Sequence, residues 1–192
     1  MPWCLYLTHP EVSIDPSVPV PEWRLSEIGR ERVLEAWQAG FAADVGSVVS
    51  SGERKAVETG EIFSEGYAVP LHVRPDLHEN DRSATGFLPP DEFEKTADRF
   101  FAEPEASIDG WERAIDAQER MVAGISKMLN EVDDGEPVLF TGHGAVGTLL
   151  MCHLMRASIS RSYDQKRGGS WYRFEKDWLH TRAGRNLGWT EL

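Results

Sequence analysis

Four short runs of apolar residues recur along the chain, each bounded by polar or turn-forming residues. They are WCLYL (3–7), VGSVVS (45–50), LHV (71–73) and PVLFT (137–141). Runs of this length between such boundaries are typical of buried β-strands. A fifth run, SWYRFEKDWL (170–179), alternates apolar and polar residues at its start and predicts a half-exposed strand at the edge of the sheet.

Helical signals lie between these runs. Ser26 is placed to cap one helix, and Asp109 and Glu112 are placed to start the longest one. Ser50 and Glu53 have the S-x-x-E spacing of a capping box. This spacing predicts the start of a third helix, which lies between the other two in the chain. Strands that alternate with helices predict a parallel sheet. We therefore expect one three-layer α/β domain over residues 1–192, with a mostly parallel sheet and helices on both faces.

Composition narrows the class of protein. A length of 192 residues is enough for a sizeable core, and the formal net charge of −12 opposes binding to nucleic acid or to an anionic membrane. No apolar run approaches the roughly 18 residues of a membrane span, and the N-terminal segment lacks the basic region of a signal peptide. Cys4 and Cys152 show no spacing motif, which favours free thiols and a cytoplasmic location.

Residues 80–108 interrupt the alternation of strands and helices. They contain three prolines and predict an insertion with one short helix around Asp91–Phe101. Such an insertion either walls or covers a site or is a surface excursion, and both alternatives stay open.

The segment VLFTGHGAVG (138–147) matches the loose dinucleotide-binding pattern G-x-G-x-x-G. That fingerprint also needs an acidic residue about 20 positions further on, at the end of a second strand. Residues 157–168 are polar and show no strand pattern. We therefore expect a loop that presents His143, with glycines that let the chain turn tightly and let its backbone approach an anion.

A second histidine occupies an equivalent position. His9 follows the first apolar run as His143 follows the fourth. In an open parallel sheet, ligands bind beyond the carboxyl ends of the strands. A single histidine at such a place is usually structural, whereas two in equivalent places favour a shared ligand.

Short segments around these histidines follow one another in a set order. They are Thr8-His9-Pro10, Leu25–Val33, Ser50-Ser51 with Arg54, Leu77-His78-Glu79 and Thr141-Gly142-His143-Gly144. This ordered set, which spans residues 4 to about 155, resembles the histidine phosphatase superfamily, also called phosphoglycerate mutase-like. In that family the corresponding segments are Arg-His-Gly, a segment like LT-x-x-G-x-x-Q-A, a strand ending in serines before a helix with an arginine, Leu-x-Glu, and His-Gly.

The resemblance implies phosphoryl transfer without a metal. His9 would be the nucleophile, since a neutral imidazole keeps a lone pair near pH 7. Arg54 would bind phosphate oxygens with its planar fork of donors, and His143 would donate a hydrogen bond to them and carry positive charge in the anionic site. Glu79 would protonate the leaving alkoxide and then activate the water that hydrolyses the phosphohistidine.

The chain departs from the family beside the nucleophile. Thr8 stands where the family has a phosphate-binding arginine, a change worth about 3 kcal/mol of transition-state stabilisation or more. Arg82 and Arg24 are candidates to replace it, although each also suits a solvated surface. Together with Thr8, we expect Ser51, Arg82 and Gly144 to bind the substrate.

These observations lead us to expect a phosphomonoesterase that acts through a phosphohistidine on a small phosphorylated metabolite. No cofactor is expected, and no H-x-x-x-H or H-E-x-x-H spacing indicates a metal site. Two alternatives stay open: a non-catalytic relative that binds a phospho-ligand, and a mutase-type phosphotransferase. The expected partner is the small substrate, with no nucleic acid or membrane, and a homo-oligomer stays open.

Overall fold

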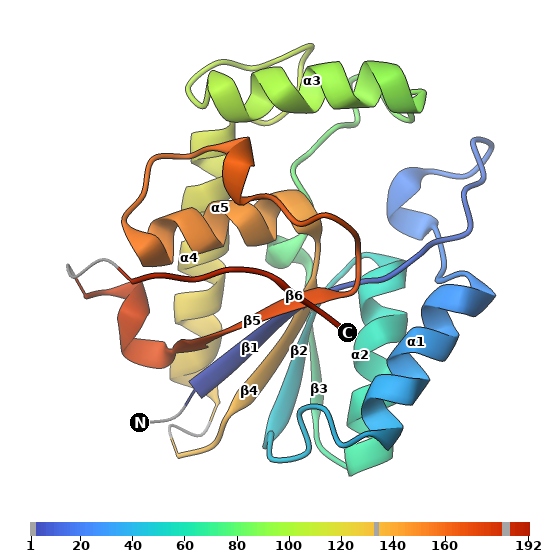
Figure 1. Ribbon diagram of the computed structural model, residues 1–192, viewed down its shortest axis with the longest axis vertical. Coiled ribbons are helices and arrows are strands. Elements are labelled where there is room, and N and C mark those ends of the chain that lie inside the picture. Colours follow the sequence, from blue (N-terminus) through green and yellow to red (C-terminus); the bar gives the residue numbers. More distant parts are fainter. Residues whose placement is uncertain (1–2, 133–134, 182–184) are drawn as a thin grey trace.

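A six-stranded sheet forms the centre of the computed structural model, which describes residues 3–132, 135–181 and 185–192 (Figure 1). The strand order is β3-β2-β4-β1-β5-β6. The four strands β1 to β4 are parallel, whereas β5 and β6 run antiparallel to their neighbours. The strands are β1 (Trp3–Thr8), β2 (Ser47–Ser51), β3 (Leu71–Arg74), β4 (Val138–Gly142), β5 (Ser170–Glu175) and β6 (Thr190–Glu191).

Helices cover both faces of this sheet. They are α1 (Glu27–Gln38), α2 (Arg54–Tyr67), α3 (Pro90–Ala102), α4 (Ala114–Glu131) and α5 (Gly144–Met155). Figure 1 shows α1 and α2 on one side of the sheet and α4 and α5 on the other. The three-layer α/β architecture with a mostly parallel sheet is confirmed. No helix among the described residues is long and apolar enough to cross a membrane.

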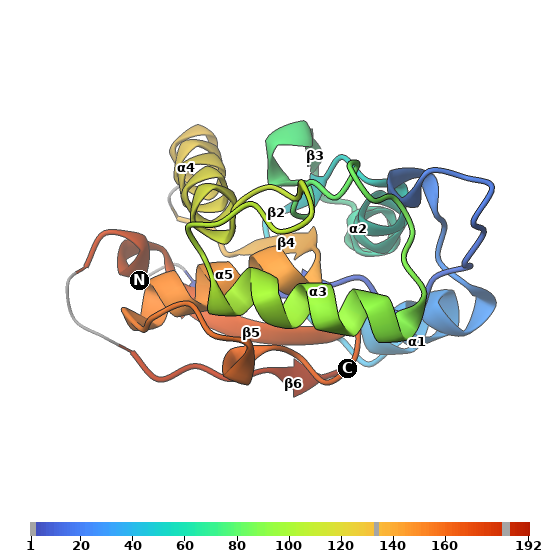
Figure 2. The ribbon, with the colours of Figure 1, turned by 90° about the horizontal axis from the view of Figure 1, so that it is seen from above.

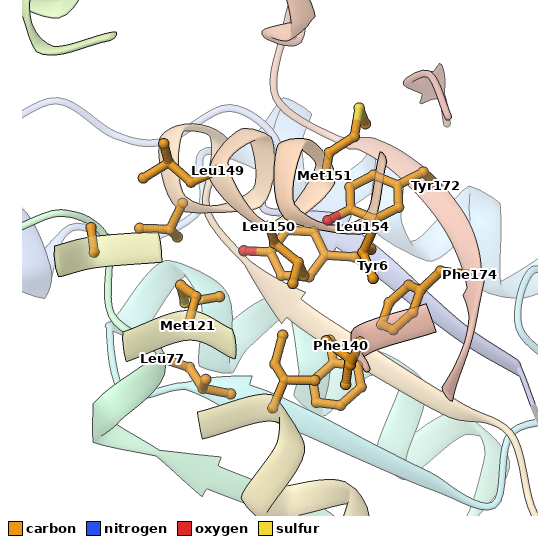
Figure 3. Packing of buried hydrophobic residues seen from close by; sticks show 14 of the residues in the cluster. Tyr6, Leu77, Met121, Phe140, Leu149, Leu150, Met151, Leu154, Tyr172 and Phe174 are labelled. Carbon is orange, nitrogen blue, oxygen red and sulfur yellow. The ribbon is translucent and has the colours of Figure 1, made fainter. Parts of the chain in front are cut away.

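The alternation of side chains along β1 divides the core in two. Leu5 and Leu7 belong to the cluster under α1 and α2, whereas Cys4 and Tyr6 belong to the cluster under α4 and α5. Figure 3 shows Tyr6 beneath α5, close to Tyr172. The two rings stack with their centroids 5.5 Å apart. The buried rings thus fix β1 against β5 and α5.

The predicted helix caps have different outcomes. The Ser26 hydroxyl accepts a hydrogen bond from the Gly29 N–H (3.1 Å), which confirms that cap. The Ser50–Glu53 capping box is wrong. Ser50 is still part of β2, and its buried hydroxyl donates to the Ser51 carbonyl (2.8 Å), so Glu53 itself becomes the N-cap of α2.

Two further predictions need correction. The longest helix, α4, begins at Ala114 and not near Asp109, because Asp109 and Gly110 adopt left-handed backbone angles (φ 52° and 84°) that a right-handed helix excludes. The strand β5 ends at Glu175, and it is not the edge of the sheet, because β6 pairs with its first two residues.

The helix α3 crosses above the end of the sheet where the parallel strands end (Figure 1). Figure 2, which looks down on this end, shows α3 lying across it, from the side of α1 to above α5. The sequence predicts this helix over Asp91–Phe101, within one residue of its observed bounds. Cys4 and Cys152 are both buried free thiols.

The glycines of the His143 loop are needed for space and not for backbone angle. None of Gly142, Gly144 and Gly147 has a positive φ. A Cβ on Gly142 would lie 2.4 Å from the Tyr6 hydroxyl, and one on Gly147 would lie 2.4 Å from Tyr6 Cε1. His143 alone separates β4 from α5, which confirms the expected tight turn, whereas Gly142 and Gly147 are needed to make room for the Tyr6 ring.

We predict that Gly147→Ala lowers the free energy of unfolding by about 1–3 kcal/mol, since the buried Tyr6 ring must shift to make room. Gly188→Ala is the matched control, because a Cβ there meets nothing within 4 Å, and its effect should stay within about 0.5 kcal/mol. Urea unfolding of both variants measures this. Equal losses of unfolding free energy in the two variants would show that the contact between Gly147 and Tyr6 does not restrict the residue at position 147.

Candidate active site

His9 and His143 meet where two adjacent parallel strands end. Thr8 of β1 pairs with Gly142 of β4, so the next residue of each strand lies at the same edge of the sheet. The ring centroids are 5.3 Å apart, and the rings meet at 70°. His143 is fully buried, whereas His9 is partly exposed. This separation allows one small anion to contact both rings.

The His9 ring is held in one tautomer. Its Nδ1 lies 2.8 Å from the Pro10 carbonyl oxygen, which can only accept a hydrogen bond. The proton therefore sits on Nδ1, and Nε2 keeps its lone pair. Burial, followed by the positive charge of Lys55, lowers the pKa of His9 to about 4. At neutral pH the ring is uncharged and its Nε2 is available as a nucleophile.

The His143 ring offers a donor in the same place. Its Nε2 lies 2.7 Å from the Ser51 hydroxyl, which already accepts a hydrogen bond from the Glu53 N–H (3.2 Å). The Ser51 proton is thus free to point at Nε2. Burial lowers the pKa of His143, which favours a neutral ring, so the expected positive charge on His143 needs correction for the free protein. With Ser51 as the donor to Nε2, the neutral ring carries its proton on Nδ1. That Nδ1 is buried and has no hydrogen-bond partner among the described residues.

The cation beside the histidines is Lys55. Its side chain is buried, and its Nζ donates to a Glu53 carboxylate oxygen and to the Val20 carbonyl (2.9 Å). Burial raises the pKa of Glu53, but its surroundings, which include the charge and hydrogen bond of Lys55 and the hydrogen bond from the Glu79 N–H, hold that pKa below its ordinary value. Glu53 is therefore a buried carboxylate paired with a buried ammonium.

Arg54 does not join this group. Its Nε donates to Glu58 Oε1 (3.0 Å), and its side chain is 43% exposed. Successive side chains of a helix point about 100° apart, so only one of the neighbours Arg54 and Lys55 can face inward. The expectation that Arg54 lies with the two imidazoles needs correction, and Lys55 takes that place.

Glu79 sits at the first turn of α5. Its two carboxylate oxygens accept hydrogen bonds from the N–H groups of Val146 (3.1 Å) and Ala145 (3.3 Å). Its own N–H donates to Glu53 Oε1 (2.9 Å). Burial raises the pKa of Glu79, and the charge of Arg82 opposes this without cancelling it. A carboxyl group of raised pKa is suited to donate a proton near neutral pH.

Thr8 is committed to contacts within the chain. Its side chain is fully buried, and its hydroxyl donates to Gln165 Oε1 (2.6 Å) while it accepts from the Ser170 N–H (3.0 Å). The other amide atom of Gln165, Nε2, lies against Gly144 at the start of α5. Thr8 and Gly144 therefore both contact Gln165 beside the histidine pair, and the structure does not test whether they bind a substrate.

The two arginines expected as replacements have different surroundings. Arg24 lies on the surface with its side chain 64% exposed, and it faces Glu58 at 3.8 Å. Arg82 lies over the rings of Phe93 and Trp111, with Cζ 5.1 and 5.6 Å from their centroids. Its charge acts on His9, His143 and Glu79. Arg82 is thus near the site, and Arg24 is not.

A cavity of about 780 Å³ opens beside these groups. Glu79 and Arg82 line it, together with most residues from 80 to 94, which belong to the predicted insertion. Asn80 also lines it, and the buried Nδ2 of Asn80 has no partner among the described residues. Across the ranges that the structure describes, no group of three or more potential metal ligands lies together.

Sequence reasoning missed Lys55, Glu53, Gln165 and Asn80. For Lys55 the available signal was its place next to Arg54 at the start of a helix, which left two cations to choose between. Gln165 lies 157 positions from Thr8, and nothing local marks it. Lys55, Glu53 and Gln165 are hydrogen-bonded to other polar groups around the two neutral imidazoles, whereas Asn80 Nδ2 has no partner among the described residues.

The chain matches one known protein family over most of its length. The family described as histidine phosphatase superfamily (branch 1) matches residues 19–175. The chain belongs to the histidine phosphatase superfamily. The match begins after Thr8-His9-Pro10, so it says nothing about that segment of this histidine phosphatase superfamily member. No curated protein matches the chain.

Solved structures share the fold of this histidine phosphatase superfamily member. A mycobacterial glucosyl-3-phosphoglycerate phosphatase is 17% identical, with a TM-score of 0.79 over 99% of this chain and 96% of that one. YhfR of Bacillus stearothermophilus is 21% identical, with a TM-score of 0.78 over 91% of each chain. A phosphoserine phosphatase from Entamoeba histolytica, in complex with 3-phosphoglyceric acid, is 12% identical, with a TM-score of 0.75 over 100% and 98%.

The neighbouring cations should differ in their contribution to stability. We predict that Lys55→Met lowers the free energy of unfolding by about 3–5 kcal/mol, because it leaves the Glu53 carboxylate buried and unpaired. Arg54→Met removes only an exposed pair with Glu58 and should cost less than about 1 kcal/mol.

Urea unfolding at pH 7 measures both variants. Adding Glu53→Gln to Lys55→Met should recover part of the loss, since the unpaired charge is then removed. Similar losses for Lys55→Met and Arg54→Met would contradict the assignment of Lys55 as the buried cation.

Proposed function

We propose that this protein is a metal-independent phosphomonoesterase in which His9 carries the phosphoryl group. One observation carries the proposal: the His9 and His143 rings lie with their centroids 5.3 Å apart, His9 Nδ1 is bonded to the Pro10 carbonyl oxygen, and the buried Nδ1 of His143 has no partner among the described residues. This pairs a nucleophile with a donor for a phosphate oxygen. An unpaired buried donor costs about 1–3 kcal/mol, which a bound phosphate oxygen would recover.

The first step moves the phosphoryl group to the ring. The Nε2 lone pair of His9 forms a bond to phosphorus while the bond from phosphorus to the ester oxygen breaks in line. The Glu79 carboxyl group gives its proton to that leaving oxygen, so the alcohol departs neutral. The raised pKa of Glu79 favours the protonated form that this step requires.

The second step restores the enzyme. The Glu79 carboxylate takes a proton from a water molecule, whose oxygen attacks phosphorus as the bond to Nε2 breaks. Phosphate leaves, His9 returns to its neutral form, and Glu79 is again protonated. Microscopic reversibility makes one carboxyl group sufficient for both steps.

His143 and Lys55 stabilise the phosphoryl oxygens. The Nδ1–H of His143 donates one hydrogen bond, and Lys55 supplies positive charge from its buried pair with Glu53. A lysine already paired with a carboxylate offers less than a free guanidinium. We therefore expect slower turnover of generic phosphomonoesters than two arginines beside the nucleophile would give.

The names of the structural neighbours agree with small phosphorylated metabolites as substrates. Two of them are a glucosyl-3-phosphoglycerate phosphatase and a phosphoserine phosphatase. Small phosphorylated substrates are therefore the class that we propose for this chain.

A second candidate, a non-catalytic relative that binds a phospho-ligand, has one observation in its favour. The Thr8 hydroxyl is fully engaged by Gln165 and Ser170, so the position beside the nucleophile supplies neither a charge nor a free donor. Such a protein would bind phosphate and would show no turnover.

Steady-state hydrolysis of p-nitrophenyl phosphate and of an alkyl phosphate tests the main proposal. His9→Ala should abolish activity on both. Glu79→Gln should slow hydrolysis of the alkyl phosphate by about 10²–10⁴-fold, with a smaller effect on the first step for p-nitrophenyl phosphate, whose leaving group needs little protonation. Arg54→Met is the matched control and should keep most of the activity.

Chelator should leave the rates unchanged. Activity retained in His9→Ala would rule out the phosphohistidine route. Phosphate binding without any turnover in the unmodified protein would favour the non-catalytic candidate.

A further inference from the structure

The cavity beside Glu79 has two apolar walls from distant parts of the chain. One wall comes from the segment around the short 3₁₀ helix η1 (Val20–Glu22), and the other comes from the segment before and at the start of α3. Trp23 and Phe87 close the space between the walls, with ring centroids 5.7 Å apart. The apolar lining residues are Pro19, Val20, Pro21, Trp23, Phe87, Leu88, Pro90 and Phe93.

This cavity continues the catalytic group. Glu79, the proposed proton donor, lines it, and so does Glu53. Lys55 connects the two regions, because its Nζ bonds both Glu53 and the Val20 carbonyl of the first wall. A proton donor faces the leaving oxygen of an ester, so the cavity holds the alcohol side of the substrate.

The charges around the cavity give an anionic alcohol no net attraction. Four carboxylate residues line it, namely Glu53, Glu79, Asp81 and Glu94. Glu53 is paired with Lys55, Glu94 is paired with Arg161, and Glu79 is the proposed acid. The one cationic lysine or arginine among the lining residues is Arg82, whose guanidinium is stacked over Phe93 and Trp111. A second carboxylate or phosphate on the substrate would therefore find no surplus of positive charge and would lose its water against the apolar walls.

We infer that the substrate is a phosphomonoester of a bulky apolar alcohol, aromatic or branched, that carries no further negative charge. This inference rests on the proposed function, since the cavity receives the leaving alcohol of that reaction. It separates this protein from neighbours whose names include phosphoglycerate, a polar and anionic compound. The apolar walls bind the alcohol by removing its surface from water, and Phe87, which is 40% exposed, has ring surface left for it to cover.

A matched set of aryl esters tests this inference. Phenyl, naphthyl and meta-carboxyphenyl phosphates have leaving groups of similar acidity, so differences in kcat/KM report the cavity and not the chemistry. Naphthyl phosphate should exceed phenyl phosphate by about tenfold, as expected for burial of a second ring. The carboxyphenyl ester should fall below phenyl phosphate.

Two variants locate the effect. Phe87→Ala should remove most of the naphthyl advantage, because it lowers kcat/KM for naphthyl phosphate more than for phenyl phosphate. Tyr163→Ala is the matched control, because Tyr163 is a similarly exposed aromatic residue (37%) that does not line this cavity. It should leave the ratio of naphthyl to phenyl rates unchanged.

Calorimetric binding of naphthylmethyl and benzyl phosphonates separates this inference from the proposed function. Tighter binding of the naphthyl compound that Phe87→Ala weakens, without any turnover of the esters, would support the cavity and overturn the phosphatase. Turnover without a preference for naphthyl, or with a preference for the carboxyphenyl ester, would overturn the inference and leave the phosphatase standing. No binding and no turnover would overturn both.

Discussion

The Tyr6 hydroxyl holds the backbone of His143 from both sides, and the arrangement of the site depends on this contact. It donates to the His143 carbonyl and accepts from the His143 N–H, each at 3.1 Å. On the neighbouring strand the His9 N–H donates to the Gly142 carbonyl (2.9 Å). The two imidazoles are therefore positioned by backbone contacts of β1 and β4. Gly142 and Gly147 have no side chains, and this leaves room for the Tyr6 ring beside their backbone.

The electrostatics of the site follow from burial. Burial and the nearby charge of Lys55 lower the pKa of both histidines, so neither ring repels the other and His9 keeps its nucleophilic lone pair. Lys55 is paired with Glu53 inside the protein, and Arg54 is paired with Glu58 at the surface. The pKa of Glu79 is raised, which suits this residue to act as the general acid. Titratable groups whose pKa values are shifted in opposite directions by their surroundings are typical of acid–base sites.

The site residues that follow the strands could be predicted from the sequence. His9, His143 and Glu79 each follow a predicted strand, and a parallel sheet brings such positions to one edge, so their proximity could be foreseen. The choice between Arg54 and Lys55 could not, because it depends on the residue at which α2 begins, and the predicted capping box placed that start wrongly. The bond between Thr8 and Gln165, and the cavity wall shared by Trp23 and Phe87, join segments far apart in the chain, so no local pattern reveals them.

The central claim is that the His9 Nε2 takes up the phosphoryl group. Trapping the intermediate tests it most directly: the protein is mixed with p-nitrophenyl phosphate, quenched in alkali to preserve phosphohistidine, and mapped by peptide mass spectrometry. We expect phosphate on His9 and none on His143, with more of it in Glu79→Gln, where the water that removes it is poorly activated. Turnover without phosphate on His9, or equal labelling of a His9→Ala variant, would contradict the account.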